Sequence, residues 1–433
     1  MKKVAFHTLG CKVNQYETQA MSENFMNNGY DIVEDTEAAD VYVINTCTVT
    51  NVGDKKSRQF IRKVKRINPG AIIAVVGCYS QTAPEEVAKI EGVNIIIGTN
   101  DRNKIVDLVE ECTVEDHINI VEDIMQVKEF EDMSIQEIKD KTRAFLKIQE
   151  GCNQYCSYCI IPYARGNIRS RRRSEIINEI NKLVENGFKE VVLTGIHVAS
   201  YGRDLEEENN LINVLKEVNE IDGIERIRLS SLEPTLFTES FLLELSKLKK
   251  VCKHFHLSLQ SGSDTVLKRM NRKYTTEQYR NIVKLIRSSY PDVSLTTDII
   301  VGFPGETDEE FQETYDFVKE MNFSMIHVFK FSPRKGTPAA EYTNQVHGIT
   351  KNKRSEKLIK LGQEMQERYM NKFLGNSVDV LVESPSKEME GYMEGTTDNY
   401  IKVVCKVSEE FEGKIIKVIL TDTKDSYMIG EFI

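Results

Sequence analysis

Short, continuously apolar runs alternate with amphipathic stretches over the first 112 residues. The apolar runs are rich in β-branched residues and predict strands at 3–9, 41–46, 72–77 and 95–98. The stretches between and after them predict helices at 14–28, 53–68, 84–90 and 102–111. Strands without polar alternation are covered on both faces, so this alternation predicts an α/β domain with a doubly wound parallel sheet.

From about residue 143 the repeating unit becomes longer. Strands are expected at 144–149, 190–197, 225–231, 254–261, 294–303 and 325–332. Helices are expected between them at 174–187, 211–221, 239–249, 275–289 and 308–321. Six strands with five intervening helices predict a partial (β/α)6 barrel, smaller than the closed eight-unit form.

The last part of the chain changes pattern again. Residues 350–373 predict one long amphipathic helix, because apolar side chains recur at three- and four-residue steps. Short strands follow at 378–383, 391–396, 400–407, 414–420 and 427–432, which predicts a small β-barrel of a type that often contacts RNA. Residues 376–433 hold twelve acids against six bases, and this composition weakens a general RNA-binding role for the barrel.

These patterns divide the chain into four parts: 1–112, an acidic connection at 113–140 that is partly helical near 134–139, 141–374 and 375–433. The net charge of −10 resides in one segment, since residues 107–140 hold twelve acids and two bases. The remainder is neutral in sum and can carry basic patches. No apolar run is long enough to span a membrane, and the start of the chain lacks the apolar core of a signal peptide, so we expect a cytoplasmic protein without membrane contact.

Three cysteines lie close together at Cys152, Cys156 and Cys159. Thiolates favour iron–sulfur clusters or zinc. A four-iron cluster normally takes four cysteines, so three would leave one iron open to a cofactor or substrate. Structural zinc requires four protein ligands, and the next histidine along the chain, His197, is distant. A disulfide with a spare thiol is disfavoured by the odd cysteine count. The spacing therefore favours an open iron–sulfur site over these two alternatives.

Three further cysteines each follow a predicted strand of the first domain: Cys11, Cys47 and Cys78. The carboxyl ends of parallel strands meet at the edge where such sheets bind ligands. A single free cysteine is commonly a buried core residue. Three cysteines at the same edge instead predict a second three-thiolate cluster site. Cys112, Cys252 and Cys405 have no such neighbouring cysteines and are expected to be ordinary core or surface residues.

Polar residues also follow the predicted strands of the barrel. Function concentrates at that face of α/β barrels. We expect the cofactor-binding residues there, namely Gly195, His197, Glu233, Gln260 and Asp298. The segment GFPGET at 302–307 lies at the same face, but it is equally compatible with a turn.

Two basic runs favour contacts with nucleic-acid phosphates. Residues 55–66 hold seven bases and no acid, and five arginines lie within residues 165–173. Runs of positive charge without acids attract the phosphate backbone of nucleic acids, and guanidinium groups match the geometry of phosphate. The residues expected to contact RNA are Lys55, Lys56, Arg58, Arg62, Arg165, Arg171, Arg172 and Arg173. The alternatives are a charged helix without a ligand for the first run and salt bridges to nearby acids for the second.

Four segments together carry a family resemblance: TLGCKVNQYET at 8–18, INTCTVT at 44–50, VVGCYSQ at 75–81 and EGCNQYCSYCIIPYARG at 150–166. Over its full length the chain resembles the methylthiotransferase family of radical S-adenosylmethionine enzymes. The resemblance implies that Cys152, Cys156 and Cys159 bind a radical-generating 4Fe–4S cluster, and that Cys11, Cys47 and Cys78 bind an auxiliary 4Fe–4S cluster. It also implies a carboxy-terminal TRAM barrel, two S-adenosylmethionine molecules that supply the methyl group and the radical, and a low-potential electron donor of the flavodoxin or ferredoxin type.

The form GCKVNQ around Cys11 is most similar to bacterial enzymes that act on N6-threonylcarbamoyladenosine beside the anticodon of tRNA. The resemblance implies a monomer that binds the tRNA anticodon stem-loop and forms the 2-methylthio derivative. Relatives that act on isopentenyladenosine carry a GCQMN-like form, and those that modify a ribosomal-protein aspartate a GCPKN-like form. A non-catalytic iron–sulfur protein that binds RNA is the rival from another class.

Overall fold

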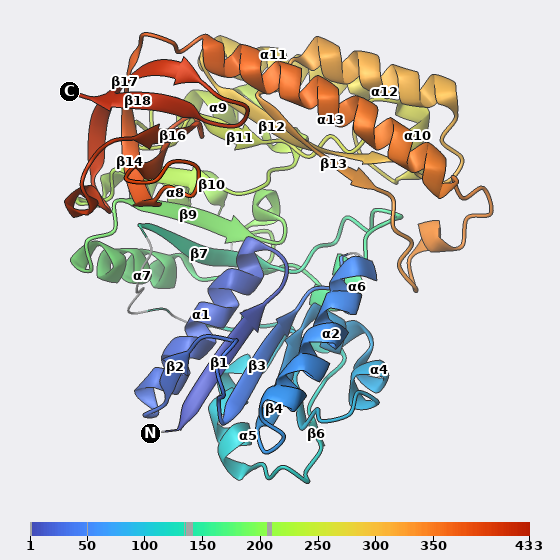
Figure 1. The fold of residues 1–433 in the computed structure, drawn as a ribbon. Helices are drawn as coiled ribbons and strands as arrows, with labels where there is room; N and C mark the ends of the chain where they lie inside the picture. Colours follow the sequence, from blue (N-terminus) through green and yellow to red (C-terminus); the bar gives the residue numbers. More distant parts are fainter. Residues whose placement is uncertain (1, 50, 134, 136–141, 206–209) are drawn as a thin grey trace.

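The chain folds into three parts that lie against one another (Figure 1). A computed structural model describes residues 2–49, 51–133, 135, 142–205 and 210–433. An amino-terminal α/β domain packs below a partial barrel, and a small closed barrel covers one end of that partial barrel. The predicted fold class is confirmed in all three parts.

The amino-terminal sheet is entirely parallel, with strand order β2-β1-β3-β4-β5-β6. Its strands are β1 (Lys3–Thr8), β2 (Asp31–Val33), β3 (Val41–Thr46), β4 (Ile72–Gly77), β5 (Ile95–Ile96) and β6 (Ile118–Asn119). Its helices are α1 (Lys12–Asn27), α2 (Asn51–Ile67), α3 (Cys78–Thr82), α4 (Pro84–Ala88) and α5 (Ile105–Glu111), with the 3-10 turn η1 (Arg102–Lys104). Buried side chains of α1 and α5 pack on one face, and those of α2 on the other, as a doubly wound sheet requires.

The central part consists of two sheets, β10-β9-β7-β8 and β11-β12-β13, which isolated parallel bridges connect. Its parallel strands are β7 (Arg143–Glu150), β9 (Glu190–Gly195), β10 (Arg226–Leu229), β11 (His254–His256), β12 (Ser294–Val301) and β13 (Met325–Lys330). The short strand β8 (Arg169–Ser170) is antiparallel to β7. These six parallel strands form the predicted partial barrel.

Helices cover the outside of the partial barrel (Figure 1). They are α7 (Arg173–Glu185), α8 (Leu211–Glu220), α9 (Glu239–Leu245), α10 (Asp264–Arg269), α11 (Thr276–Ser289), α12 (Asp308–Met321) and the long α13 (Gly348–Asn371). The short helix α6 (Ile161–Arg165) and the 3-10 turns η3 (Val198–Ser200), η4 (Pro234–Leu236) and η5 (Pro338–Ala340) lie in the connecting loops. Thr275 and Thr307 begin α11 and α12 with complete capping boxes, which explains why these helices start where their sequences predict.

The carboxy-terminal barrel is closed, with strand order β14-β15-β16-β18-β17. Its strands are β14 (Ser377–Pro385), β15 (Met393–Thr397), β16 (Lys402–Cys405), β17 (Ile415–Thr423) and β18 (Met428–Phe432), with the 3-10 turn η6 (Glu409–Phe411). Arg226 and Arg228 of β10 donate hydrogen bonds to backbone carbonyls of this barrel at 2.8 to 3.0 Å. The barrel is therefore docked at the amino ends of the central strands. Its closed five-stranded form is the one expected of a TRAM domain.

Two local predictions differ from the structure. Residues 113–140 are more than a connection, because β6 adds a strand to the amino-terminal sheet and η2 (Ile124–Gln126) packs against α6. The helix expected near 134–139 lies outside the described residues. The strand expected at 254–261 ends at His256. Beyond it Leu257 and Gln260 form only isolated bridges, to Leu232 and Ile299, and Gln260 adopts a left-handed backbone with φ of 70°.

Within the described chain, no helix is both long and apolar enough to cross a lipid bilayer.

Candidate active site

Three cysteines gather at the carboxyl edge of the amino-terminal sheet; we call Cys11, Cys47 and Cys78 the strand-end triad. Cys11 precedes α1, Cys47 follows β3 and Cys78 begins α3 directly after β4. Each lies within electrostatic range of the others. Gly10 permits this approach, because a Cβ on it would lie 2.9 Å from the Cβ of Cys47. The parallel sheet thus collects three thiols that are far apart in sequence.

Asn14, on the first turn of α1, ties these strand ends together. Its Nδ2 donates to the carbonyls of Leu9 at 2.8 Å and Thr46 at 2.9 Å. Asn45 in turn donates to the Asn14 carbonyl at 3.0 Å. Asn14 is buried, so these bonds are not weakened by competition with water.

The second group of thiols, the loop triad, consists of Cys152, Cys156 and Cys159 in the loop after β7. The Cys159 amide donates to the Cys156 carbonyl at 2.9 Å, which closes the loop into a turn. The Ser157 amide donates to the Met270 carbonyl at 3.0 Å and fixes the loop to the end of α10. The three cysteines are within electrostatic range of one another.

Arg165, at the end of α6, connects the two triads. Its Nε donates to Cys78 Sγ at 3.2 Å, and its Nη2 donates to Asn14 Oδ1 at 2.7 Å. Its Nη1 lies 2.5 Å from carboxylate oxygens of both Glu17 and Glu150. Because Glu150 immediately precedes the loop triad and Asn14 orders the strand ends, one guanidinium group fixes both sites relative to each other.

The thiols fit a metal cluster that supplies positive charge. Burial raises the pKa of Cys78 and of Cys159 to about 12, and that of Cys152 to about 11. Thiolates in such surroundings need a compensating cation, and a metal centre provides one. Among the described residues, no three Cys, His, Asp or Glu side chains meet closely enough to share a single metal ion. Each site offers three thiols, which suits a multi-iron cluster whose cysteines bind different irons, whereas a structural zinc ion requires four protein ligands.

Polar side chains surround the loop triad from the barrel interior. Glu233 accepts two hydrogen bonds from Arg272 at 3.0 and 2.9 Å and lies 3.7 Å from His197 Nε2. Arg272 Nη1 also donates to Cys156 Sγ at 3.3 Å. Burial alone would raise the pKa of Glu233, but its contacts with His197 and Arg272 lower it, so this carboxylate stays charged. The His197 backbone amide donates to Gln149 Oε1 at 2.6 Å.

A cavity of about 250 Å³ adjoins Cys159 and is lined by Gln260 and Asp298. Its apolar walls include Ile300 and Phe331, and Val49 reaches it from the amino-terminal domain. The cavity therefore opens between the loop triad and the domain that carries the strand-end triad. A bound small molecule here would be in contact with both parts of the chain.

Of the five expected cofactor-binding residues, two line this cavity and three lie outside its lining. His197 and Glu233 flank Arg272, and Gln260 and Asp298 line the cavity. Gly195 contributes space rather than contacts, because a Cβ there would lie 2.9 Å from the Gln149 carbonyl oxygen. Arg272 and Asn14 were not among the expected site residues. Asn14 lies inside the segment 8–18 that carries the family resemblance, which could have indicated it, whereas no quoted motif marks Arg272.

The structure corrects the expectation for two of the arginines. Arg165 and Arg171 are buried, at 0% and 1% exposure, so neither presents its guanidinium group to an RNA phosphate. Arg171 instead pairs with Glu179 and with Asp132 at 2.5 and 2.6 Å, which confirms the salt-bridge alternative for it. Arg172 is exposed, and the half-buried Arg173 lies 3.1 Å from Glu217.

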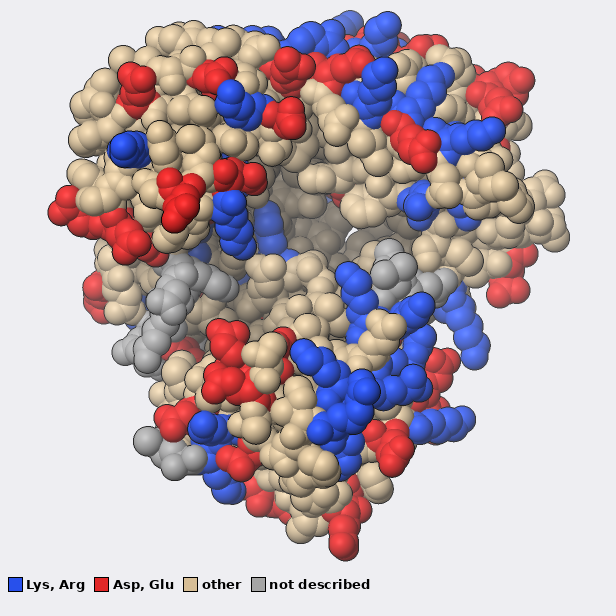
Figure 2. All heavy atoms as spheres, in the orientation of Figure 1, with Lys and Arg blue, Asp and Glu red and all other residues tan. Residues whose placement is uncertain are grey.

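Basic side chains gather over α2 on the surface of the amino-terminal domain, beside a hollow that faces the rest of the molecule (Figure 2). Lys55, Lys56 and Arg62 are exposed. Arg58 is half-buried, and its Nη1 donates to the Tyr79 hydroxyl at 3.0 Å. Four of the expected RNA contacts thus lie on one helix, three of them open to solvent.

Known proteins resemble this chain over its full length. Residues 146–318 match the Radical SAM superfamily, and residues 3–98 match the Uncharacterized protein family UPF0004. The threonylcarbamoyladenosine tRNA methylthiotransferase MtaB of Bacillus subtilis (strain 168) is 46% identical over 100% of this chain and 97% of its own length. The chain belongs to the radical S-adenosylmethionine methylthiotransferase family.

Another member, the tRNA-2-methylthio-N(6)-dimethylallyladenosine synthase of Clostridium tetani (strain Massachusetts / E88), is 38% identical to this methylthiotransferase over 98% of the chain and 95% of the relative. Among solved structures, the radical S-adenosylmethionine methyltransferase TsrM of Kitasatospora setae has a TM-score of 0.59 at 14% identity. It covers 78% of this chain and 77% of its own, and at that identity it supports the fold alone.

We predict that Arg165→Met destabilises the protein by about 3–5 kcal/mol, because it removes one partner from a buried network of charges. Thermal unfolding of anaerobic protein would measure the loss. Arg173→Met is the matched control, since its half-exposed pair with Glu217 is expected to contribute at most about 1 kcal/mol. Equal losses in the two variants would contradict a connecting role for Arg165.

Proposed function

We propose that this protein methylthiolates C2 of N6-threonylcarbamoyladenosine next to the anticodon of tRNA, giving 2-methylthio-N6-threonylcarbamoyladenosine. The observation that carries the proposal is the full-length relation to the Bacillus subtilis enzyme, combined with two thiol triads joined through Arg165. Family membership implies a 4Fe–4S cluster and S-adenosylmethionine. A second cluster, on the strand-end triad, belongs to the proposal.

Cys152, Cys156 and Cys159 would hold the radical-generating 4Fe–4S cluster, and the strand-end triad would hold the auxiliary one. When bound, these groups and S-adenosylmethionine supply the electron transfer, the carbon-centred radical, the sulfur and the methyl group. Gln260 and Asp298 line the space beside the loop triad and orient what binds there. Apolar Ile300 and Phe331 exclude water from the same space, which protects a reactive species from solvent.

The fixed charges of the chain keep this site in one arrangement. Glu233 accepts two hydrogen bonds from Arg272. The Arg272 side chain therefore cannot move away from Cys156 without breaking this buried pair. Arg165 performs the same task between the triads. The side chains position groups rather than react themselves, as expected where the cofactors carry the chemistry.

The substrate partner is the tRNA anticodon stem-loop, and we propose that Lys55, Lys56, Arg62 and Arg172 contact its phosphates. All four side chains are exposed. The functional units would be 1–112 with the auxiliary cluster, the acidic segment 113–140, the radical core 141–374 and the TRAM barrel 375–433. We further propose that the protein acts as a monomer in the cytoplasm and takes electrons from a flavodoxin- or ferredoxin-type donor.

Mass spectrometry of tRNA nucleosides tests the substrate. A strain that lacks the gene should lose 2-methylthio-N6-threonylcarbamoyladenosine and accumulate its threonylcarbamoyl precursor, while methylthiolated isopentenyladenosine persists. The reverse pattern would assign the protein the substrate named for the Clostridium tetani enzyme. The lower sequence identity to that enzyme, 38% against 46%, disfavours this alternative.

Iron content tests the clusters. Anaerobically reconstituted protein should hold about eight irons per chain, and alanine replacement of either whole triad should leave about four. The variant without the strand-end triad should still cleave S-adenosylmethionine to 5′-deoxyadenosine, whereas the variant without the loop triad should not. Zinc in place of iron, or about four irons in the unmodified chain, would exclude the two-cluster proposal.

Salt dependence tests the RNA surface. Replacing Lys55, Lys56 and Arg62 together by glutamine should weaken stem-loop binding and reduce the slope of log affinity against log salt by about 2–3. A control that replaces Lys182, Lys247 and Lys249, exposed on and beside the outer helices α7 and α9, should leave the slope unchanged. An unchanged slope in the α2 variant would remove this helix from the RNA contact.

A further inference from the structure

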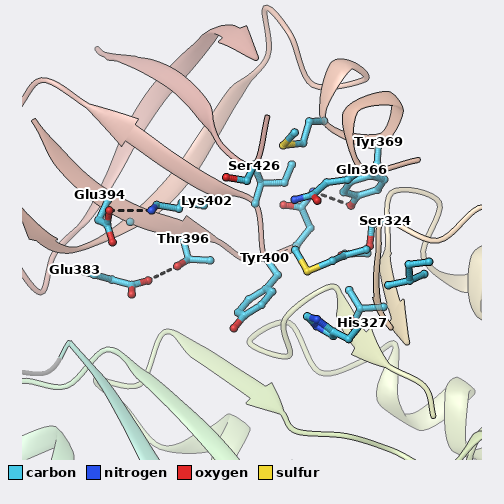
Figure 3. A pocket seen from close by; sticks show the side chains of 18 of the residues that line it. Ser324, His327, Gln366, Tyr369, Glu383, Glu394, Thr396, Tyr400, Lys402 and Ser426 are labelled. Carbon is cyan, nitrogen blue, oxygen red and sulfur yellow. Dashed lines mark hydrogen bonds and ion pairs between the residues drawn. The ribbon is translucent and has the colours of Figure 1, made fainter. Parts of the chain in front are cut away.

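A cavity of about 530 Å³ lies where the carboxy-terminal barrel meets the amino ends of β12 and β13 (Figure 3). Ser294, Thr296 and His327 line it from the central strands, and Thr396 and Tyr400 line it from the small barrel. Its lining is mixed, with hydroxyl, imidazole, phenol and apolar groups. Nothing in the radical site described above uses this space.

The cavity continues the interior of the partial barrel rather than forming a separate surface pocket. Alternate residues of a strand face the same side. On β12, Ser294 and Thr296 line this cavity, whereas Asp298 and Ile300 line the cavity beside the loop triad. Asp298 and Thr296 are two residues apart, a rise of about 7 Å. His256 bridges the two, with Nδ1 3.0 Å from Thr296 Oγ1 and Nε2 3.3 Å from Asp298 Oδ2.

Most charges around this interior already have partners. Arg143 pairs with Glu383 at 2.8 Å, and Arg228 forms a two-bond pair with Glu190 at 2.7 and 3.2 Å. Lys402, another residue of the cavity wall, lies 3.0 Å from Glu394 (Figure 3). The cations that line the cavity are thus neutralised.

Lys12 is different. It is half-buried at the start of α1, and its ammonium group lies within electrostatic range of Tyr400, Arg143 and Arg228. Across the described part of the chain it has no hydrogen bond or ion pair from its side chain. The carboxylate in the same range, Glu190, is engaged by Arg228. Among the described groups around Tyr400, Lys12 is therefore a cation without a carboxylate of its own.

A partly buried charge without a partner is costly, so this interior favours a ligand that brings a negative charge. The threonylcarbamoyl group carries a carboxylate, whereas the dimethylallyl group named for related enzymes carries no charge. C2 and the N6-bearing carbon flank N1 of the purine ring. A base that presents C2 to the loop triad can therefore extend its N6 substituent along the interior toward Tyr400.

We infer that Lys12 binds the carboxylate of the threonylcarbamoyl group and thereby selects this base over uncharged N6-substituted adenosines. The inference rests on the proposed function. A lysine suits the role because its compact ammonium group can direct hydrogen bonds at a carboxylate of variable orientation.

Fluorescence anisotropy with three anticodon stem-loops tests the inference. One loop carries threonylcarbamoyladenosine, the second its analogue with the carboxylate converted to a methylamide, and the third unmodified adenosine. The wild type should bind the first at least about tenfold more tightly than the second, the ratio expected of a charge-assisted hydrogen bond. Lys12→Met should bring the ratio to about one, Lys12→Arg should restore most of it, and the cavity-wall control Lys402→Met should keep it.

The unmodified loop separates specificity from other effects, because its affinity should be the same in all four proteins. Equal weakening of all three loops by Lys12→Met would make Lys12 a phosphate contact and overturn the inference, as would an unchanged ratio. Iron content shows whether Lys12→Met disturbs the neighbouring Cys11. If it does, the Lys12→Arg protein, which keeps a positive charge at this position, still tests the inference. The protein could keep the Lys12-dependent preference for the first loop and yet fail to methylthiolate it. That result would contradict the proposed function but not the inference about Lys12.

Discussion

A buried network of charges between the amino-terminal domain and the barrel determines where the two thiol triads lie. Glu17 of α1 and Glu150 of β7 share three cations, Arg102, Arg165 and Lys147. Arg102, Arg165, Lys147 and the two glutamates are all essentially inaccessible to solvent. Buried charges of this kind do not necessarily stabilise a fold, but breaking the set is costly, and the contacts fix one arrangement of the domains. A reaction that involves both triads requires that single arrangement.

The same interface has a second attachment on the other side of the site. Arg334, after β13, donates to Thr48 Oγ1 at 2.6 Å and to Asp54 Oδ2 at 2.5 Å. Thr48 is adjacent to Cys47, so the strand-end triad is held from the far end of the barrel as well as from α6. With one attachment the domains could pivot, but with this second one beside Cys47 a rotation would break buried pairs.

Much of this site could be predicted because its cysteines come directly after predicted strands. Cys11, Cys47 and Cys78 follow consecutive strong strand signals, and a parallel sheet brings such positions to one edge. The roles of Arg165 and Arg171 could not be predicted, because an arginine matches a carboxylate as well as a phosphate and its burial depends on a distant domain. The early end of β11 also escaped prediction, since the alternating apolar residues Phe255, Leu257 and Leu259 continue the strand pattern past the point where regular pairing stops.

The acidic composition of the carboxy-terminal barrel is explained by where it docks. Its contact with the central strands uses backbone carbonyls of residues 379 and 396–398, to which Arg226 and Arg228 donate. The positive partners therefore come from β10, and the barrel needs no basic surface to bind there. In that position it closes the amino end of the interior and contributes Tyr400 to its wall. The barrel thus shapes the interior of the central domain at that end.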